Sequence, residues 1–287
     1  MPIAMLPERS VIKVAGEDAR HFLHNLLTCD VLALIPGQAG FGALLTPQGK
    51  IIADMFVIAL DEDDGGGFLL DVNAGPAPEL LRRLGLFRLR SKLAMADISD
   101  AVAVLALWGD GGMDAPEALV IADPRLAAMG HRVIVPKDSA LGIVNTTPQS
   151  YHEHRIALGV PDGGKDFAYG DAYPHEALMD QLNGVSSTKG CYVGQEVVSR
   201  MQHRGTGRTR IIPVRFENGF SPEWGVIAMA GGKPLGQVGS SAHGRGLAML
   251  RLDRVADAMA SGHPMLGGGL AFTPEKESWM DFEVPGV

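Results

Sequence analysis

The sequence predicts an α+β protein that ends in a small antiparallel β-barrel. Two observations support this prediction. In the first 140 residues, turn residues join apolar stretches into hairpins, without the regular strand–helix alternation that builds a doubly wound parallel sheet. After residue 205, short apolar segments are separated by Gly, Pro, Asn and Ser at even spacing. That spacing is typical of a closed or sandwiched β domain.

Composition limits the class of protein. A chain of 287 residues is long enough for two domains or three small ones, and 46% hydrophobic with 20% charged residues is typical of a globular protein with a full core. The net charge of −8 argues against a protein that coats nucleic acid. The longest apolar run, 51–60, is interrupted by Asp54 and is too short to span a bilayer. The N-terminus resembles neither a signal nor a transit peptide, so we expect a cytoplasmic protein.

Cysteine content excludes several kinds of site. Cys29 and Cys191 are the only cysteines, so the chain has no disulfide framework and no Cys-x-x-Cys metal motif. An iron–sulfur cluster is usually held by four cysteines, which this chain alone does not supply. We therefore predict no resident metal.

Apolar periodicity predicts the elements of the first half. Helices are expected at 19–27, where Phe22, Leu23 and Leu26 recur at helical spacing, and at 78–86. Strands are expected at 11–14, 41–46, 51–60, 68–72, 93–97, 101–108, 118–122 and 132–135. The acidic, glycine-rich stretch 61–67 predicts a hairpin tip, since it lacks the Gly-Lys-Ser/Thr of a phosphate loop.

The second half begins with helices and ends with strands. We expect a helix at 150–158, a long loop at 162–173, and a helix from Gly194 to a stop at Gly205. Beyond it, strands without a good helix are expected at 211–216, 225–230, 236–240, 247–252 and 270–273. The domain boundary is therefore predicted near 205–208, between an α+β region of residues 1–204 and a barrel of residues 205–287.

The octapeptide Lys189-Gly190-Cys191-Tyr192-Val193-Gly194-Gln195-Glu196 concentrates chemistry in a short stretch. Its two glycines permit backbone angles or close approaches that a side chain would block. Gln195 and Glu196 fall in the first turn of a predicted helix, where free N–H groups favour an anion, and Cys191 lies just before it, where a thiolate is stabilised. The residues alone leave two interpretations open: an ordinary turn with a buried cysteine, and a functional site.

Two basic clusters also have two interpretations each. Arg200, His203, Arg204, Arg208 and Arg210 follow the octapeptide. They suit a polyanionic ligand or an exposed linker. The earlier cluster consists of Arg82, Arg83, Arg88, Arg90 and Lys92. We interpret it as a solvated helix face in preference to a ligand site.

A family resemblance appears around the octapeptide. Residues 183–196 resemble the signature of the YgfZ proteins, folate-binding relatives of the glycine-cleavage T-protein, an aminomethyltransferase. Residues 22–38, 49–55, 72–75 and 236–248 are similar to further parts of that superfamily, in the same order. Arg155 with Gly159-Val160-Pro161-x-Gly163 resembles the branch that includes the mitochondrial iron–sulfur assembly factor.

The resemblance implies a fold and a role. The implied fold is a T-protein-like ring of three small domains around a folate-sized central cavity, ending in the antiparallel β-barrel. Within residues 1–204, two intertwined subdomains are implied, 1–48 with 140–204, and 49–139. The implied role is a tetrahydrofolate-binding accessory protein for assembly or repair of iron–sulfur enzymes, linked in bacteria to tRNA thiomethylation. The partners would be iron–sulfur assembly proteins and client enzymes, with no membrane and no direct nucleic-acid binding.

The resemblance also assigns residues. Cys191 is the expected reactive group, with Lys189 and Asp54 as further catalytic residues. The residues expected to hold tetrahydrofolate or a one-carbon derivative are Asn73, Tyr192, Gln195, Glu196, Arg200 and Arg204. Arg200 and Arg204 are assigned to the acidic tail of the folate.

Two departures from the T-protein pattern affect the function. Ala53-Asp54 replaces a pair of acidic residues, and Ala157 stands where many members have a glutamate. Loss of one carboxylate weakens the case for aminomethyl transfer, which needs an acid/base group near the reacting nitrogen. The accessory role is therefore preferred, with an aminomethyltransferase and a non-catalytic folate sensor or scaffold as the alternatives.

Overall fold

The protein is described by a computed structural model that covers residues 1–62, 66–110, 117–204 and 208–287, with the side chains of residues 203 and 204 left undescribed. It forms two compact units. Unit 1 comprises residues 1–151 and 182–196, and unit 2 comprises residues 152–181 and 197–287. Part of the predicted hairpin tip at 61–67, the predicted helix stop at Gly205 and most of the boundary at 205–208 lie outside the described residues.

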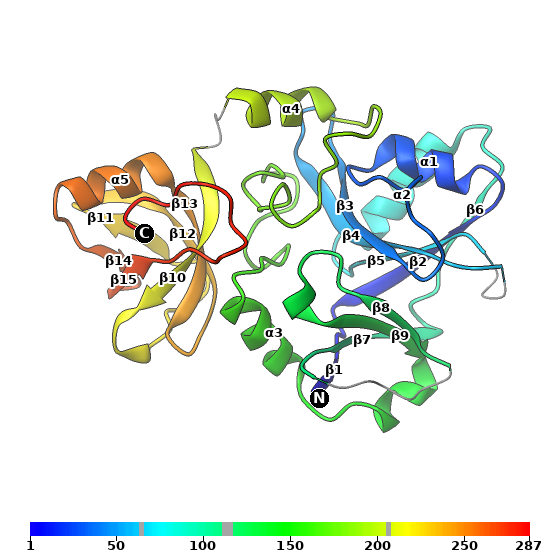
Figure 1. Cartoon of the computed structure of the whole chain (residues 1–287), viewed down its shortest axis with the longest axis horizontal. Helices are drawn as coiled ribbons and strands as arrows, with labels where there is room; N and C mark the ends of the chain where they lie inside the picture. The colour runs from blue at the N-terminus through cyan, green and yellow to red at the C-terminus, as the bar shows by residue number, and fades with distance from the viewer. Residues whose placement is uncertain (63–65, 111–116, 205–207) are drawn as a thin grey trace. The chain divides into compact units, whose positions relative to one another are not determined.

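Unit 1 contains a five-stranded antiparallel sheet with two helices on one face (Figure 1). The strands, in sheet order, are β3 (Ala39–Leu45), β4 (Ile51–Ala59), β5 (Phe68–Asn73), β2 (Arg9–Ala15) and β6 (Ala94–Asp97). The helices are α1 (Ala19–Leu26) and α2 (Ala77–Arg88). They pack against the alternate residues Ala53, Met55 and Val57 of β4, so Asp54 and Phe56 point to the opposite face.

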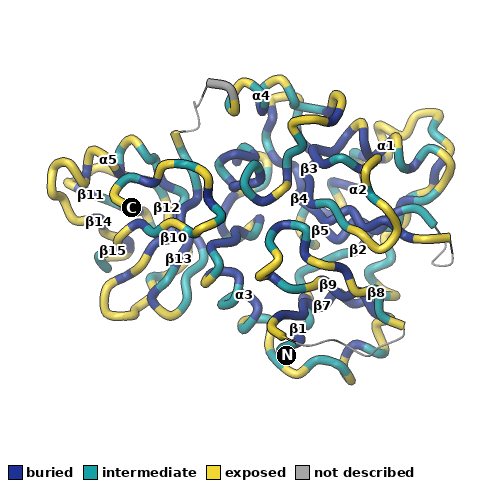
Figure 2. Tube along the Cα trace, viewed as in Figure 1, coloured by how far each residue is buried: buried dark blue, intermediate teal, exposed yellow. Residues whose placement is uncertain are grey.

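Every residue of β4 is buried, as Figure 2 shows, so both faces of the sheet must be covered. A second, four-stranded antiparallel sheet in unit 1 supplies side chains for the face opposite the helices. Its strands, in sheet order, are β1 (Ile3–Met5), β7 (Val102–Leu107), β9 (His131–Pro136) and β8 (Leu119–Ala122), with 3₁₀ turns η1 (Ala127–Met129) and η2 (Lys137–Gly142). The β3–β4 hairpin crosses residues 48 and 49, where the sequence predicted a subdomain division, and holds both sides in one sheet.

Unit 2 contains a closed six-stranded antiparallel barrel. Its strands, in barrel order, are β10 (Thr209–Phe216), β13 (Arg245–Arg251), β12 (Lys233–Ala242), β11 (Ile227–Ala230), β14 (Met265–Gly267) and β15 (Leu270–Pro274), with the 3₁₀ turn η3 (Glu217–Gly219). The prediction that this domain has no good helix is wrong. Helix α5 (Leu252–Ala260) buries Val255 and Ala258, which are three residues apart and therefore share a face.

Two further helices contain points at which the chain passes from one unit to the other. They are α3 (Pro148–Ala157) and α4 (Gln195–Arg204). Residues 158–194, all of them described, form turns and loops without a helix or strand. The predicted strands and helices are confirmed to within a few residues at their ends, and β1 and β14 are additions.

Candidate functional site

Thr28 anchors the beginning of residues 183–196, the segment that resembles the family signature, within unit 1. Its hydroxyl donates to the carbonyl of Gly184 at 2.6 Å and accepts from the amide of Ala43 in β3 at 2.9 Å. The Thr28 carbonyl also accepts from the amide of Ser186 at 2.9 Å. Thr28 has no exposed surface. The loop before the octapeptide is therefore held on the edge of the five-stranded sheet.

Lys189 holds the next part of the segment on the C-terminal end of α1. Its ammonium group donates to the carbonyl oxygens of His24, Leu27 (2.5 Å) and Cys29 (3.2 Å), and lies 5.2 Å from the ring centre of Tyr192. Carbonyl groups at a helix C-terminus lack partners within the helix, and a cation there also meets the negative end of the dipole. Burial lowers the pKa of Lys189, while the nearby Cys29 and Asp30 raise it.

Gly194 and Tyr192 hold the end of the octapeptide against the sheet. Gly194 has φ +82°, and a Cβ on it would lie 2.6 Å from the Thr46 carbonyl oxygen in the β3–β4 turn, so only glycine fits. Tyr192 is 8% exposed, and burial raises its pKa to about 12. Gly190, in contrast, faces open space and has no such requirement.

Cys191 lies between these anchors and is exposed. The other cysteine, Cys29, is buried beside Gly42, where a Cβ would lie 2.6 Å from its sulfur. Burial raises the pKa of the Cys29 thiol to about 12, which makes it inert near neutral pH. The structure therefore presents one of the two cysteines to solvent, on a loop fixed at both sides.

The other predicted residues of unit 1 have varied surroundings. Asp54 is 8% exposed and pairs in register with Ala43, the residue that bonds to Thr28. Asn73 is half-buried at the end of β5, and its side-chain oxygen accepts from the amide of Gly75 at 3.0 Å. Gln195 and Glu196 begin α4, as predicted, with Gln195 half-buried and Glu196 exposed.

A buried ionic cluster that the sequence analysis did not single out lies on the face of the sheet opposite the helices. Asp71 has no exposed surface and accepts from Nε of Arg9 at 2.6 Å. Nε of Arg132 lies 3.2 Å from its other carboxylate oxygen. The Arg132 guanidinium stacks 4.8 Å above Phe56, and its Nη1 has no hydrogen-bond partner among the described residues. In the sequence, the sign that could have indicated this cluster was one acidic residue, Asp71, within the otherwise apolar segment 68–72.

A second buried pair adjoins this cluster. Arg125 donates from Nη2 to Asp123 at 2.7 Å and to the hydroxyl of Tyr151 at 3.1 Å. Its guanidinium lies 5.0 Å from the ring centre of Phe56. The paired Arg125 and the nearby Arg132 hold the pKa of Asp123 below its usual range, against the opposing effect of burial. This face of the sheet thus combines aromatic rings with fixed charges.

In unit 2, Arg155 links two segments that resemble the family, the one from Arg155 to Gly163 and the one at residues 236–248. It donates from Nη1 to Asp166 at 2.6 Å and from Nη2 to the hydroxyl of Ser240 at 2.6 Å. The amide of Ser240 donates to the same aspartate at 2.7 Å. A Cβ on Gly239 would lie 2.5 Å from the Asp166 carboxylate. These residues tie residues 152–181 to the barrel, which is a structural role.

Within the described part of the chain, the basic residues that follow the octapeptide, from Arg200 to Arg210, do not gather into one patch. Arg210 makes two hydrogen bonds to Asp180, at 3.0 and 2.9 Å, and stacks 4.4 Å above Phe282. Arg200 is exposed on α4, and the side chain of Arg204 lies outside the described part of the chain. Arg210 therefore stabilises unit 2.

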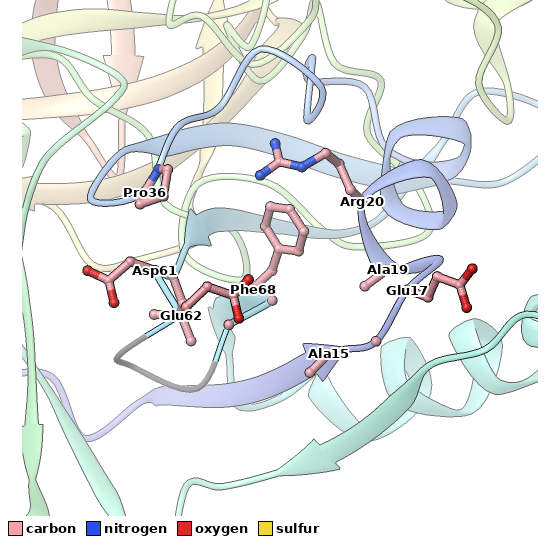
Figure 3. Close-up of a pocket in the computed structure, with 12 residues that line it drawn as sticks. Ala15, Glu17, Ala19, Arg20, Pro36, Asp61, Glu62 and Phe68 are labelled. Atoms are coloured by element: carbon pink, nitrogen blue, oxygen red, sulfur yellow. The ribbon is translucent and has the colours of Figure 1, made fainter.

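A cavity of about 790 Å³ in unit 1 lies away from the predicted residues (Figure 3). Residues at the start of α1, just after β4 and at the start of β5 line it, among them Glu17, Asp61 and Glu62. Arg20 lies 5.0 Å from the ring centre of Phe68 and donates to the carbonyl of Leu34 at 2.7 Å. The acidic lining would repel the carboxylate tail of a folate, so the cavity does not suit that ligand.

Comparison with known proteins identifies the family. Residues 8–135 match the model of the GCVT N-terminal domain, and residues 208–282 match that of the CAF17 C-terminal β-barrel domain. The iron–sulfur cluster assembly factor IBA57 homolog, mitochondrial, of Pyricularia oryzae is 32% identical over 289 residues, which cover 90% of this chain and 74% of the relative. The chain belongs to the CAF17/IBA57-type family. The human iron–sulfur cluster assembly factor IBA57, mitochondrial, is also 32% identical and is covered over 77% of its length.

A solved structure supports the same assignment at the level of fold. The crystal structure of glycine cleavage system aminomethyltransferase T from Bartonella henselae superimposes with a TM-score of 0.76. The superposition covers 98% of this CAF17/IBA57-type chain and 86% of that chain, at 16% sequence identity. The predicted T-protein-like fold with a terminal β-barrel is therefore confirmed. The relatives confirm the predicted resemblance to the branch of the mitochondrial iron–sulfur assembly factor.

The comparisons bear on location only through the names of the relatives. The two IBA57 proteins are named mitochondrial, so the cytoplasmic location of this family member stays a prediction. Within the described residues, no helix combines the length and the apolar character that crossing a membrane requires.

Proposed function

We propose that this protein is an assembly factor for iron–sulfur proteins, with Cys191 as the group that meets a cluster carried by a partner. Two relatives bear the name of iron–sulfur cluster assembly factors. The observation that supports a role for Cys191 is its exposure between two fixed points, the buried Lys189 and the tightly packed Gly194. A thiol that is exposed on a rigid support loses little conformational entropy when a partner binds.

The chemistry that we propose for Cys191 is ligation. The thiol loses its proton to solvent, and the sulfur donates an electron pair to an iron atom of the partner's cluster. The step forms an Fe–S bond and needs no oxidant or reductant. One thiol cannot hold a cluster by itself, because clusters are usually held by four ligands, so the partner supplies the others. Lys189 acts as a positioning residue, since its ammonium group is bonded to three carbonyl oxygens of α1 and its following loop.

Folate binding is a further part of the proposal, and the chemistry of unit 1 fits it. A pterin is a flat ring with hydrogen-bond donors and acceptors along its edge. The sheet face opposite the helices carries the buried carboxylate of Asp54, aromatic rings and the Arg132 N–H group that has no described partner. Asp54 and Asn73 would hold the pterin, and Tyr192, Gln195 and Glu196 would adjoin it.

Bound tetrahydrofolate would supply a carrier for a one-carbon unit. The proposed partners are iron–sulfur assembly proteins and their client enzymes. The link to tRNA thiomethylation would run through such clients, because the net charge of −8 disfavours direct binding of nucleic acid.

A pair of cysteine variants tests the role of the thiol. A strain that lacks the gene would be complemented with the wild type, Cys191→Ser or Cys29→Ala, and the activity of cluster-dependent enzymes would be measured. We expect the exposed Cys191 to be required and the buried Cys29 to be dispensable. Full complementation by Cys191→Ser, at equal protein level, would remove Cys191 from the mechanism.

Folate binding is tested separately by calorimetry with tetrahydrofolate. Saturable binding that Asp54→Asn weakens supports the assigned site, with Asp30→Asn as a control at a half-buried carboxylate on the loop after α1. Absence of binding by the wild type would remove folate from the proposal without affecting the role of Cys191. Formation of methylene-folate with an aminomethyl-loaded lipoyl carrier protein would instead establish the transferase alternative.

A further inference from the structure

The C-terminal end of α2 exposes apolar side chains. Gly85 to Arg90 are six consecutive exposed residues. Leu86 is 64% exposed, Phe87 41% and Leu89 89%. A single exposed leucine is ordinary on a protein surface, but a cluster that adjoins charged residues marks an interaction site.

The packing of α2 does not require these side chains. The helix buries Ala77, Leu80 and Leu84 against the sheet, and their spacing of three and four residues defines its inner face. Leu86 lies on the outer face, and Phe87, which continues the inner-face spacing past the last buried residue, is still 41% exposed. Leu89 follows the helix and belongs to no described core. None of the three side chains is a member of a described hydrophobic core.

Leu89 occupies a backbone conformation that normally selects glycine. Its φ is +45° and its ψ is −109°, and the amide of Ser91 donates to the carbonyl of Arg88 at 2.8 Å across it. This is the first central position of a type II′ turn, which Gly dominates because a Cβ is strained there. The chain thus keeps a large apolar side chain at a position where it costs stability and makes no core contact.

The same surface is basic in an acidic protein. Residues 79–92 carry one carboxylate against five cations, a net charge of +4 in a chain of −8. Glu79 is bonded to Arg82 and Arg83, and Lys92 lies 3.0 Å from Glu17. Arg88 and Arg90 flank Leu89 and have no side-chain partner within the described part of the chain. Two guanidinium groups are therefore available next to the exposed apolar side chains.

We propose that Leu86, Phe87, Leu89, Arg88 and Arg90, here called the α2 patch, form a docking surface for an acidic segment of a partner protein. Apolar side chains of the segment would cover Leu86, Phe87 and Leu89, and its carboxylates would pair with Arg88 and Arg90. Arginine and aromatic residues are enriched in protein interfaces, where lysine is depleted, and four of the five cations here are arginines.

The observations favour a protein over a membrane or a nucleic acid. Outside residues 79–92 the chain carries about −12, which an anionic bilayer or a phosphate backbone would repel. Single-stranded nucleic acid is held by stacking on aromatic rings, and the α2 patch offers one ring among aliphatic side chains. The proposal does not depend on Cys191 or on folate.

The test measures binding of a defined probe to the full chain. The probe is a fluorescein-labelled amphipathic helical peptide with leucines along one face and glutamates along both borders of that face. Fluorescence anisotropy should show saturable binding that weakens as salt rises. Two altered peptides, one with serine for leucine and one with lysine for glutamate, should bind about 10-fold more weakly or not at all. Failure of the wild-type protein to bind the acidic amphipathic peptide would overturn the proposal.

Variants connect the binding to the α2 patch. Leu89→Gly should weaken binding about 10-fold while the Tm stays equal or rises, because glycine suits the turn. Arg88→Glu with Arg90→Glu should abolish it. Ile227→Ser and Lys233→Glu, which change an exposed apolar residue and an exposed cation of the barrel, should leave it within about two-fold.

Two further probes separate the competing partners. Vesicles of phosphatidylserine and phosphatidylcholine, and a short single-stranded RNA, would be titrated under the same conditions. If either one bound more tightly than the peptide and lost binding in the double arginine variant, the α2 patch would be a lipid or RNA surface and the proposal would be wrong. Loss of peptide binding in Ile227→Ser as much as in Leu89→Gly would place the contact elsewhere.

Discussion

The side-chain nitrogen of Lys189 lies 2.5 Å from the carbonyl oxygen of Leu27, which is 162 positions earlier in the chain. This contact fastens the octapeptide to the end of α1. The same ammonium group also meets the carbonyls of His24 and Cys29, so one side chain satisfies three backbone acceptors. Lysine has three donors and no acceptor, which makes it suited to such a cap.

Replacement of Lys189 by methionine should therefore lower the stability of the protein. The methionine keeps much of the apolar stem but leaves three carbonyl oxygens without their donor. We expect a loss of about 2–3 kcal/mol in the free energy of unfolding, since a hydrogen bond to a charged group is worth about 1.5–3 kcal/mol and the freed carbonyls regain water. Urea unfolding followed by circular dichroism measures it.

The rate at which iodoacetamide alkylates Cys191 distinguishes a structural lysine from a catalytic one. If Lys189 only positions the loop, the rate in Lys189→Met should change by less than about three-fold, because the ammonium group is engaged by carbonyls and not by the thiol. A rate that falls by about ten-fold or more would show that Lys189 activates the thiol directly.

Asp71 should be more important for stability than any surface carboxylate. It lies with no exposed surface between the half-buried Arg9 and the buried Arg132, so Asp71→Asn removes the anion that both guanidinium groups face. Breaking a buried pair costs about 3–5 kcal/mol. Glu79→Gln, which removes an exposed partner of Arg82 and Arg83, is the control and should hardly move the urea midpoint. Equal effects of the two variants would contradict the buried ionic cluster.

The strands and helices of unit 1 were predictable because their apolar residues recur with the periods of the elements. The central strand is one example: all nine residues of β4 are buried, and the sequence there is an almost unbroken apolar run. Helix α5 shows how the same method fails. Its buried Val255 and Ala258 have helical spacing, but the surrounding pattern of short strands favoured a barrel without helices.

The partners within the candidate site were not predictable, because they are distant in sequence. The octapeptide predicted that the thiol of Cys191 and the lysine act together in catalysis. In the structure, Lys189 is instead hydrogen-bonded to the end of α1, and Cys191 is exposed. Asp71 was an acidic residue in an apolar strand, and its pairing with Arg132 depends on how two sheets face each other. Register and alternation within one strand contain no such information.

His175 should make the stability of unit 2 depend on pH. It is 3% exposed, and neither ring nitrogen has a hydrogen-bond partner within the described structure. Burial lowers its pKa below the ordinary value near 6.5, Asp180 raises it and Arg210 lowers it. The folded state thus favours the neutral ring. Stability is full above about pH 6.5 and falls as the pH drops from there toward the lower folded-state pKa, because the unfolded chain takes up the proton first.

Thermal unfolding between pH 5 and pH 7.5 checks this dependence. The variant His175→Gln has no titrating ring, so its Tm should decline less than that of the wild type as the pH falls. His263→Gln, at an exposed histidine of the barrel region, should keep the wild-type slope. A wild-type slope in His175→Gln would assign the dependence to other groups.

Leu89→Gly should stabilise the protein, although it removes a large side chain. Leu89 is 89% exposed, so its loss opens no cavity, and its φ of +45° is strained for any residue with a Cβ. Relief of about 1–3 kcal/mol of strain outweighs the entropy that glycine adds to the unfolded chain, for a net gain of about 1 kcal/mol and a Tm rise of about 2–4 °C. Differential scanning calorimetry measures it, with Leu86→Gly as the control, since glycine within the helix costs stability. A lower Tm for Leu89→Gly would mean that the leucine supports the fold, and would remove the argument that it is retained for a partner.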